Sequence, residues 1–439
     1  NSSWTQLGSD IDGEAQGDWS GESVSMNSAG DRVAIGATNN DGTASNAGHV
    51  RIYEYSNSSW TQLGSDIDGE AQGDWSGNSV SMNSAGDRVA IGALFNGGTG
   101  TDAGHVRIYE YSNSSWTQLG SDIDGEAAND RSSYSVSMNS AGDRVAIGAR
   151  RNDGTASDAG HVRIYEYSNS SWTQLGSDID GEAANDFYGN SVSMNSAGDR
   201  VAIGAANNAG TGSNAGHVRI YEYSNSSWTQ LGSDIDGEAA SDFSGTSVSM
   251  NSAGDRVAIG ATDNDGTASD AGHVRIYEYS NSSWTQLGSD IDGEAANDWS
   301  GTSVSMNSAG DRVAIGALLN DGTASNAGHV RVYSLAELFI DSQQLLPDKF
   351  TLDQNYPNPF NPITTLRYEL PENGLVNITI YDMVGRQVKT LVNQRQDAGY
   401  RSVVWDATND NGKPVSAGIY LYQIQAGGNM QTKKMVLLK

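Results

Sequence analysis

The sequence predicts an all-β protein: a six-bladed β-propeller with four-stranded blades, followed by a small β-sandwich. The main observation is a repeat, because the string NSSWTQLGSDIDGEA recurs every 56 residues. A fixed period of this length is typical of a solenoid or a propeller. The chain also contains 53 glycines and lacks long Ala/Leu/Lys/Glu blocks, which favours strands joined by many turns. The copies begin at Asn1, Asn57, Asn113, Asn169, Asn225 and Asn281.

Each unit contains four short segments with the pattern of a strand. In the first unit, SVSMN (23–27) and RVAIGA (32–37) flank the turn SAGD. HVRIYEY (49–55) follows a Gly- and Asn-rich loop, and SWTQLGSDI follows the turn SNS. Apolar residues recur at every second position, which places them on one face of a strand. Four such strands form a meander sheet, the blade of a propeller, whereas a β-helix coil would need a shorter period.

The two ends of the repeat region indicate how the ring closes. The chain opens on the SWTQLGSDI segment, and the sixth unit stops after HVRVY without one. We expect residues 3–11 to pair with the last blade, because closure removes open sheet edges. A longer precursor with a seventh blade is the alternative.

Composition changes after Leu346. All six lysines follow residue 335, and all six prolines lie between Pro347 and Pro414. Alternating runs such as VNITIYD and YRSVVWD, set between Gly, Pro and Asn turns, predict a small β-sandwich. The predicted organisation is a propeller over 1–334, a linker over 335–349 and a second domain over 350–439.

The propeller region carries the entire net charge of −29. Such an acidic surface repels phosphate backbones and anionic lipid, so we expect neither nucleic acid nor membrane surfaces as partners. No apolar run is long enough to cross a bilayer. The absence of cysteine excludes disulfides and thiolate metal sites. We expect a monomer.

Invariant acidic residues and histidines recur in every unit. The SDIDGEA motif is similar to part of a calcium-binding loop but lacks its full spacing; its carboxylates in the first unit are Asp10, Asp12 and Glu14. We predict that these carboxylates form turns and caps, and calcium binding is the alternative. Histidines on six blades lie too far apart to share one zinc, whose ligands sit at about 2 Å, so we predict packing at a strand start. They are His49, His105, His161, His217, His273 and His329.

No catalytic motif is recognisable. The sequence lacks a nucleophile elbow, a phosphate-binding glycine loop and HExxH, and six identical carboxylate pairs would be a peculiar glycosidase site. We therefore predict no enzymatic activity and no cofactor.

Differences between the units fall in two windows, 16–22 and 38–46 with their equivalents. Outside them the single change is Val332, where other copies have Ile. The first window links the outermost strand of one blade to the innermost strand of the next, and the second links the middle two strands, so both emerge at one end of the blades. Aromatic and Arg side chains on loops are enriched at binding interfaces and stack on sugars, which predicts a ligand-binding face. The candidates are Trp19, Trp75, Phe95, Arg131, Tyr134, Arg150, Arg151, Phe187, Tyr188, Phe243, Trp299, Leu318 and Leu319.

Loop drift after recent duplication is the alternative explanation of the windows. Drift, however, would also have altered the turns at the opposite end. Arg131, Arg150 and Arg151 fall in one unit, which predicts a local basic patch suited to a uronate or sulfate.

Two resemblances add to this interpretation. VAIGA (33–37), followed by a Gly-rich loop and GHVRIY (48–53), resembles the FG-GAP repeats of integrin α-subunit propellers and their bacterial relatives, over residues 1–334. The calcium loop of that family, DxDxDGxxxD, is replaced by NSAGDR (27–32), so calcium binding is not implied at this turn.

The C-terminal region resembles the sorting domain of the type IX (Por) secretion system. The hallmarks are YPNPFNP (356–362), IYDMVGRQV (380–388), AGIYLYQI (417–424) and the basic end TKKMVLLK. The resemblance implies export across both membranes of a Bacteroidota-type cell, usually followed by cleavage of the tail and release or attachment of the cargo to surface lipopolysaccharide.

The predicted function is therefore a secreted or surface-attached recognition or adhesion protein that binds a glycan or a protein. The alternatives are a structural matrix component without a specific ligand and a glycan-active enzyme.

Overall fold

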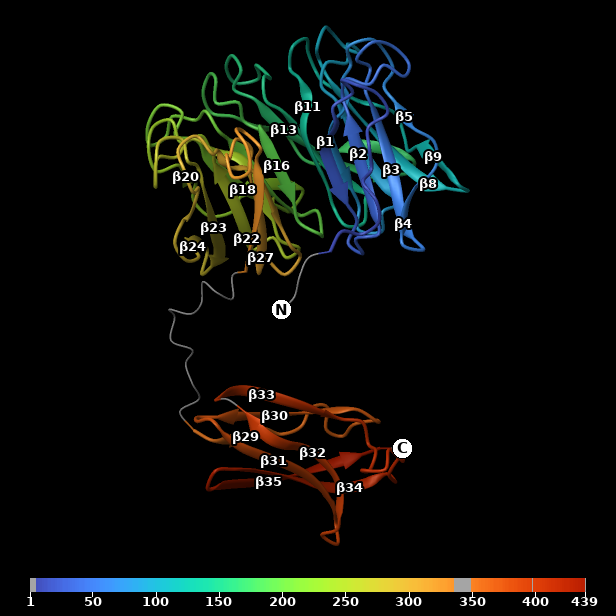
Figure 1. The fold of residues 1–439 in the computed structure, drawn as a ribbon, viewed down its shortest axis with the longest axis vertical. Coiled ribbons are helices and arrows are strands. Elements are labelled where there is room, and N and C mark those ends of the chain that lie inside the picture. Colours follow the sequence, from blue (N-terminus) through green and yellow to red (C-terminus); the bar gives the residue numbers. More distant parts are fainter. Residues whose placement is uncertain (1–4, 335–348, 397, 439) are drawn as a thin grey trace. The chain divides into compact units, whose positions relative to one another are not determined.

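The computed structural model describes residues 5–334, 349–396 and 398–438 (Figure 1). The chain divides into two compact units, Asn1–Leu338 and Phe339–Lys439. The predicted linker lies outside the described residues except for Lys349. The regular structure of both units consists of strands, so the predicted all-β fold is confirmed. Among the described residues, no helix is long and apolar enough to cross a membrane.

The first blade shows the plan of the repeat. Its sheet has the order β1 (Ser20–Met26), β2 (Arg32–Ala37), β3 (His49–Ser56), with β4 (Ser59–Gln62) and β5 (Ile67–Asp68) both paired to β3. All pairings are antiparallel, and β4 and β5 are two pieces of the predicted outer strand. A bulge lies between Ser20 and Ser23, where the innermost strand begins earlier than the sequence predicts.

The same order repeats in the next four blades, and the sixth blade has three strands. Blades two and three contain β6 (Ser76–Met82), β7 (Arg88–Ala93), β8 (His105–Ser112), β9 (Ser115–Gln118), β10 (Ile123–Asp124), β11 (Ser132–Met138), β12 (Arg144–Ala149), β13 (His161–Ser168), β14 (Ser171–Gln174) and β15 (Ile179–Asp180). Blades four to six contain β16 (Ser191–Met194), β17 (Arg200–Ala205), β18 (His217–Ser224), β19 (Ser227–Gln230), β20 (Ile235–Asp236), β21 (Ser244–Met250), β22 (Arg256–Ala261), β23 (His273–Ser280), β24 (Ser283–Gln286), β25 (Ile291–Asp292), β26 (Ser300–Met306), β27 (Arg312–Ala317) and β28 (His329–Ser334).

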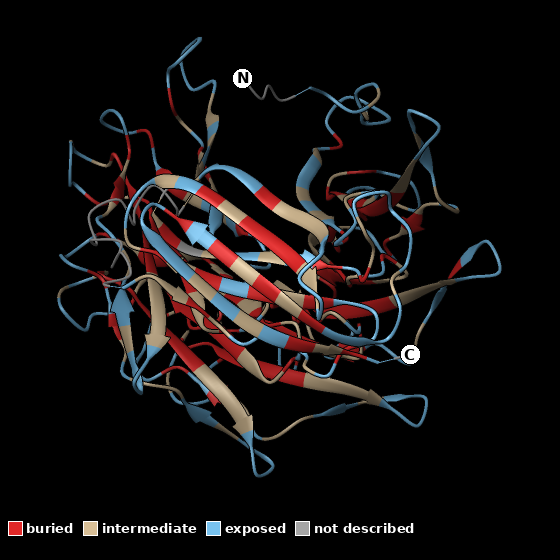
Figure 2. Cartoon of the chain, turned by 90° about the horizontal axis from the view of Figure 1, so that it is seen from below, coloured by how far each residue is buried: buried red, intermediate tan, exposed pale blue. Residues whose placement is uncertain are grey.

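The core of the propeller lies between neighbouring blades. Ile52 of blade one packs with Val89 and Ile91 of blade two in one buried cluster, and equivalent clusters follow along the array. Figure 2 shows this burial along the strands, with exposed loops at their ends. The close approach explains the Gly of VAIGA, because a Cβ on Gly36 would lie 2.1 Å from the Gly77 carbonyl oxygen.

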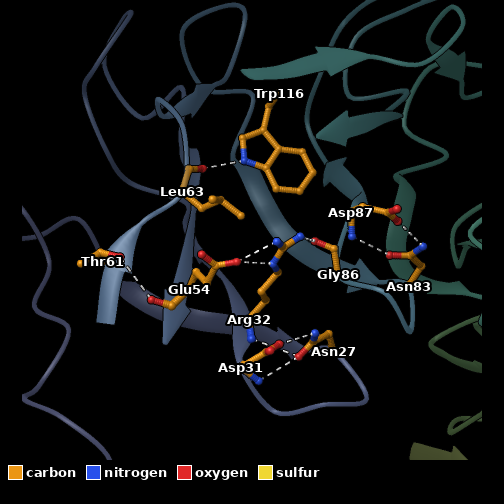
Figure 3. Close-up of polar contacts among 10 residues, drawn as sticks. All are labelled: Asn27, Asp31, Arg32, Glu54, Thr61, Leu63, Asn83, Gly86, Asp87 and Trp116. Atoms are coloured by element: carbon orange, nitrogen blue, oxygen red, sulfur yellow. Dashed lines mark hydrogen bonds and ion pairs between the residues drawn. The ribbon is translucent and has the colours of Figure 1, made fainter. Parts of the chain in front are cut away.

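Polar contacts also join the blades at the end that carries the invariant turns (Figure 3). Arg32 Nε and Nη2 donate to Glu54 within blade one, and Nη1 donates to the Gly86 carbonyl oxygen of blade two at 3.1 Å. The Trp116 indole donates to the Leu63 carbonyl oxygen at 2.7 Å. Identical residues at identical spacing therefore reproduce the same junction from blade to blade.

The predicted closure of the ring is wrong in this structure. Within the described residues, the N-terminal segment forms no strand and no outer strand covers β28. Leu7 instead accepts a hydrogen bond from the Trp60 indole at 2.8 Å, as Leu63 does from Trp116. The segment LGSDIDGEA packs against the blade that follows it, and that contact forms without closing the ring. The facing surfaces of the first and last blades are open, with Val24 63% and Val330 69% exposed.

The second unit consists of two sheets around one core. The first has the order β29 (Thr351–Leu352), β30 (Thr364–Leu370), β33 (Gly399–Trp405). The second has the order β32 (Gln387–Gln396), β31 (Gly374–Asp382), β34 (Gly418–Ala426), β35 (Asn429–Leu437). Trp405 of one sheet and Tyr422 of the other are fully buried in the shared cluster.

Candidate binding face

The fourth position of the first window, Trp19 and its equivalents, has the same unusual backbone in every copy. Its residues adopt a left-handed conformation, with φ between 52° and 56°. This conformation costs a bulky L-residue about 1–2 kcal/mol and favours Gly or Asn. None of the six copies has Gly or Asn there. We call the position the variable slot; it holds Trp19, Trp75, Arg131, Phe187, Phe243 and Trp299.

An invariant polar framework holds the two windows together beneath the slot. In blade three, the buried carboxylate of Asp130 accepts hydrogen bonds from the Ala127 amide and from Asn152 Nδ2, both at 3.0 Å. Arg151 of the second window donates its amide to the Asp130 carbonyl oxygen at 3.3 Å. Burial raises the pKa of Asp130, and the Asn152 hydrogen bond opposes that shift. The framework confirms that both windows emerge at one end of the blades.

Candidates from the first three blades lie in a row. The Trp19 and Trp75 rings meet edge to face at 6.5 Å, and Trp75 meets Phe95 in the same way at 4.8 Å. The guanidinium of Arg131 lies over the Phe95 ring at 5.0 Å. Trp19 is 57% exposed, and the others are half-buried. The row therefore presents aromatic faces and edges to solvent.

The predicted basic patch is built from stacked arginines. The guanidinium of Arg150 lies 3.6 Å from the Tyr134 ring centre and 5.8 Å from that of Phe187. Arg151 lies 5.8 Å from the Phe187 ring centre. Burial lowers the pKa of Arg150, and the neighbouring Arg151 and Arg131 lower it further. The Nε atoms of all three arginines are buried and have no hydrogen-bond partner among the described residues.

The remaining candidates are more scattered, and one is misplaced. Tyr188 is buried in the core between blades three and four and meets His217 at 6.1 Å, so its assignment to the face is wrong. It follows the slot residue and occupies the inward position that small serines fill in other blades. Within the described residues, no ring contact joins Phe243 or Trp299 to the row. Of the candidates in blade six, Trp299 and Leu318 are exposed and Leu319 is half-buried.

A second invariant feature lies at the same end of the blades. Each histidine begins the third strand of its blade, and among the described residues five of the six face two carboxylates, one from their own blade and one from the preceding segment. In blade three, His161 Nδ1 lies 3.8 Å from both Glu126 Oε2 and Asp178 Oδ2. We call each such group a junction cluster. The five complete clusters are Glu14/His49/Asp66, Glu70/His105/Asp122, Glu126/His161/Asp178, Glu182/His217/Asp234 and Glu238/His273/Asp290.

Burial lowers the pKa of all five of these histidines. For His161 the pKa falls to about 4, so the imidazole is neutral at pH 7. Arg163, whose Nη1 lies 3.3 Å from Glu126 Oε1, also lowers this pKa, whereas Asp178 raises it.

The SDIDGEA carboxylates do not converge on one ion. Asp66 joins the cluster of His49 in its own blade, whereas Glu70 joins the cluster of His105 in the next. The main-chain carbonyl of Asp68 accepts a hydrogen bond from Arg107 at 2.7 Å. Each SDIDGEA motif therefore contributes carboxylates to two junction clusters, one in its own blade and one in the next. The sequence did not reveal this arrangement, because the residues of one cluster lie about 20 to 50 positions apart. The invariance of Asp18 and Asn40 inside otherwise variable windows was the available signal for the polar framework.

Comparisons with known proteins describe the architecture. Residues 363–429 match the family model described as the FlgD Ig-like domain. No curated protein sequence matches the chain. The protein is thus a β-propeller repeat protein with a C-terminal Ig-like domain.

Solved structures with a similar fold share little sequence with the chain. The Pseudomonas aeruginosa periplasmic gluconolactonase PpgL is 10% identical, with 87% of each chain covered and a TM-score of 0.46. PorZ, a bacterial surface component of the type IX secretion system of Porphyromonas gingivalis, is 12% identical, with 98% of this chain and 61% of PorZ covered and a TM-score of 0.39. A putative 6-phosphogluconolactonase from Bacteroides uniformis is 9% identical, with 62% and 86% covered and a TM-score of 0.40. Likenesses at this level assign no activity to the chain.

Proposed function

We propose that this protein is a non-enzymatic recognition or adhesion protein of the outer cell surface, with an FG-GAP-type propeller that binds a glycan or a protein. Binding takes place on the face built from the two variable windows. The C-terminal domain directs type IX secretion and is cleaved after export. The protein acts as a monomer, and the face binds its ligand without a cofactor.

The variable slot is the observation that carries the proposal. All six copies place an aromatic ring or an arginine where the left-handed backbone favours Gly or Asn. Strained positions persist where the surrounding structure enforces them, and they cluster at binding sites. A loop that drifted without constraint would accumulate small residues there, so the retained bulk supports recognition.

The chemistry of the face indicates the class of ligand. The row formed by Trp19, Trp75 and Phe95 offers flat apolar surfaces, which suit the faces of sugar rings and the anchors of protein interfaces. The stacked arginines of blade three offer donors to a uronate or a sulfate on a disc that is otherwise acidic. An acidic glycan with neutral sugars beside its charged group fits both features.

The export proposal is supported by contacts between the YPNPFNP segment and the C-terminal TKKMVLLK segment, two of the motifs that resemble a sorting domain. The amide of Phe360 in YPNPFNP donates to the Val436 carbonyl oxygen at 3.0 Å, and Val436 donates to Asn358 Oδ1 at 2.9 Å. Phe360 packs against Trp405 with ring centres 5.6 Å apart. Segments from the two ends of the resemblance therefore form one folded unit.

A glycan and cell-surface binding array with the full chain tests the binding proposal. Changing Trp19, Trp75 and Trp299 together to glycine should weaken binding at least about tenfold, because aromatic anchors dominate interface energies. A second variant with Arg131, Arg150 and Arg151 changed to alanine should lose anionic ligands selectively.

The matched control changes Asn57, Asn113 and Asn281 to glycine. These residues are also left-handed, with φ of 50° to 51°, but belong to the invariant turns. If ligand binding is unchanged in both the tryptophan and the arginine variant, the binding site lies outside the variable face. Absence of any ligand would favour a structural matrix component, and turnover of a polysaccharide would favour an enzyme.

The export proposal has its own test. In a host with the type IX system, a chain truncated after residue 335 should remain in the periplasm, whereas the full chain reaches the surface. Surface display of the truncated chain would contradict the sorting role.

A further inference from the structure

We propose that the junction clusters bind a transition-metal dication of the zinc type, one ion per cluster. Each cluster offers one imidazole nitrogen and two carboxylate oxygens, all within 4.8 Å of one another. The proposal concerns the invariant residues between blades and stands independently of the ligand of the variable face.

In two of the clusters the histidine nitrogen that faces the carboxylates has no hydrogen-bond partner among the described residues. His161 Nδ1 and His273 Nδ1 are buried and have no hydrogen-bond partner among the described residues, and their side chains are 2% and 1% exposed. The nearest carboxylate oxygens lie 3.8–3.9 Å away, which is too far for a hydrogen bond. A buried nitrogen without a partner normally requires an explanation, and a bound cation supplies one.

The two carboxylates are already oriented by their outer oxygens. Gln174 Nε2 donates to Asp178 Oδ1 at 2.5 Å, and Arg163 Nη1 lies 3.3 Å from Glu126 Oε1. Asp178 Oδ2 and Glu126 Oε2 are therefore the atoms that face His161. Outer contacts of this kind fix the orientation of metal ligands in proteins.

The fourth blade shows what a cation does at this position. There Arg219 Nη2 lies 2.6 Å from Glu182 Oε1 and 2.7 Å from Asp234 Oδ2, and its Nε donates to Asp234. In the other blades the equivalent arginine donates instead to a main-chain carbonyl oxygen, as Arg163 does to Asp124 at 2.9 Å. One positive group therefore draws both carboxylates together in blade four, and the other four complete clusters lack such a group between them.

The donor set selects the class of metal. Imidazole and carboxylate together suit zinc and its neighbours, whereas calcium takes oxygen ligands. Zinc ligands at about 2.0–2.2 Å lie roughly 3.3 Å apart in a tetrahedron. The histidine–carboxylate distances of 3.8–3.9 Å therefore need to shorten by about half an ångström, and the distance between the two carboxylate oxygens, which is at most 4.8 Å, by up to about 1.5 Å. The glutamate side chain is partly exposed, which leaves room for water as a further ligand.

Zinc titration of the full chain, followed by isothermal calorimetry and metal analysis after dialysis, tests the proposal. We expect four saturable equivalents of zinc, because Arg219 already contacts both carboxylates of the Glu182/His217/Asp234 cluster. His161→Asn should remove one equivalent. Glu126→Gln, on a partly exposed side chain, should also remove one.

Asp153→Asn is the matched control, because this exposed carboxylate lies in the same blade outside the cluster. It should leave the number of bound ions unchanged. Arg219→Ala should add one equivalent. Absence of saturable zinc binding, or a count that neither His161→Asn nor Glu126→Gln lowers, would overturn the proposal.

Discussion

The two ends of each blade impose the same backbone conformation but fill it with different residues. At the invariant end, Asn57 and Ser58 adopt φ of 50° and 64° in a turn that recurs unchanged. At the variable end, Trp75 and Arg131 adopt φ of 54° and 52°. Asn tolerates the left-handed region, whereas Trp, Arg and other residues with a Cβ are destabilised by it.

The invariant end and the variable end of each repeat differ in what their residues do. The invariant end uses recurring turns and main-chain hydrogen bonds between blades, such as that from the Ser84 amide to the Ser140 carbonyl oxygen at 3.2 Å, to hold the array together. The variable end keeps its framework of Asp130 and Asn152 type and changes only the residues above it. Under the proposed function, stability depends on one set of residues and recognition on another.

The largest effect is expected where the framework supports both windows. Asp130→Ala removes a carboxylate that accepts two hydrogen bonds at 3.0 Å and leaves the Asn152 amide buried without that partner. The free energy of unfolding, measured by urea denaturation, should fall by about 2–3 kcal/mol, and ligand binding should fall with it. Asp153→Ala, which removes one exposed hydrogen bond, is the control. Equal losses in the two variants would show that the framework is not what holds the loops.

A smaller effect is expected at the opposite end. Arg88 donates twice to Glu110, at 2.9 and 2.7 Å, and once to the Gly142 carbonyl oxygen of the next blade at 3.1 Å. Arg88→Ala should lower the free energy of unfolding by about 1–2 kcal/mol, since the ion pair is partly exposed. Binding at the variable face should not change. A parallel loss of binding would show that the two ends are coupled.

Much of this architecture was predictable from the sequence, because each blade is local. In RVAIGA and HVRIYEY, apolar residues recur at every second position, as expected for the buried face of a strand. The predicted bounds of these strands differ by at most one residue from those of β2 and β3. The variable face follows from comparing copies. Tyr188 was misassigned because sequence alone does not show which neighbour of the slot points inward.

Contacts between blades were harder to predict. A junction cluster combines Glu126, His161 and Asp178, which only the register of β13 with β15 and the packing of the preceding segment bring together. Closure of the ring failed as a prediction for a related reason. The N-terminal segment accepts hydrogen bonds from Trp60 and Arg51 of blade one. These bonds do not depend on blade six, so they form whether or not the ring closes.

The smallest effect tests the strain on which the comparison rests. Trp19 is well exposed, so replacing it removes little packing beyond the ring contact with Trp75. Trp19→Gly should raise the free energy of unfolding by about 0.5–1 kcal/mol relative to Trp19→Ala, because alanine keeps the left-handed strain and glycine relieves it. Asn57→Gly should change stability by only a few tenths of a kcal/mol, because Asn tolerates this conformation. Urea denaturation of the three variants measures the differences. If glycine stabilises the slot while ligand binding weakens, the bulky residue is retained at a cost to folding, and drift no longer explains the variable face; if glycine and alanine behave alike, the slot is unstrained and that argument for recognition is lost.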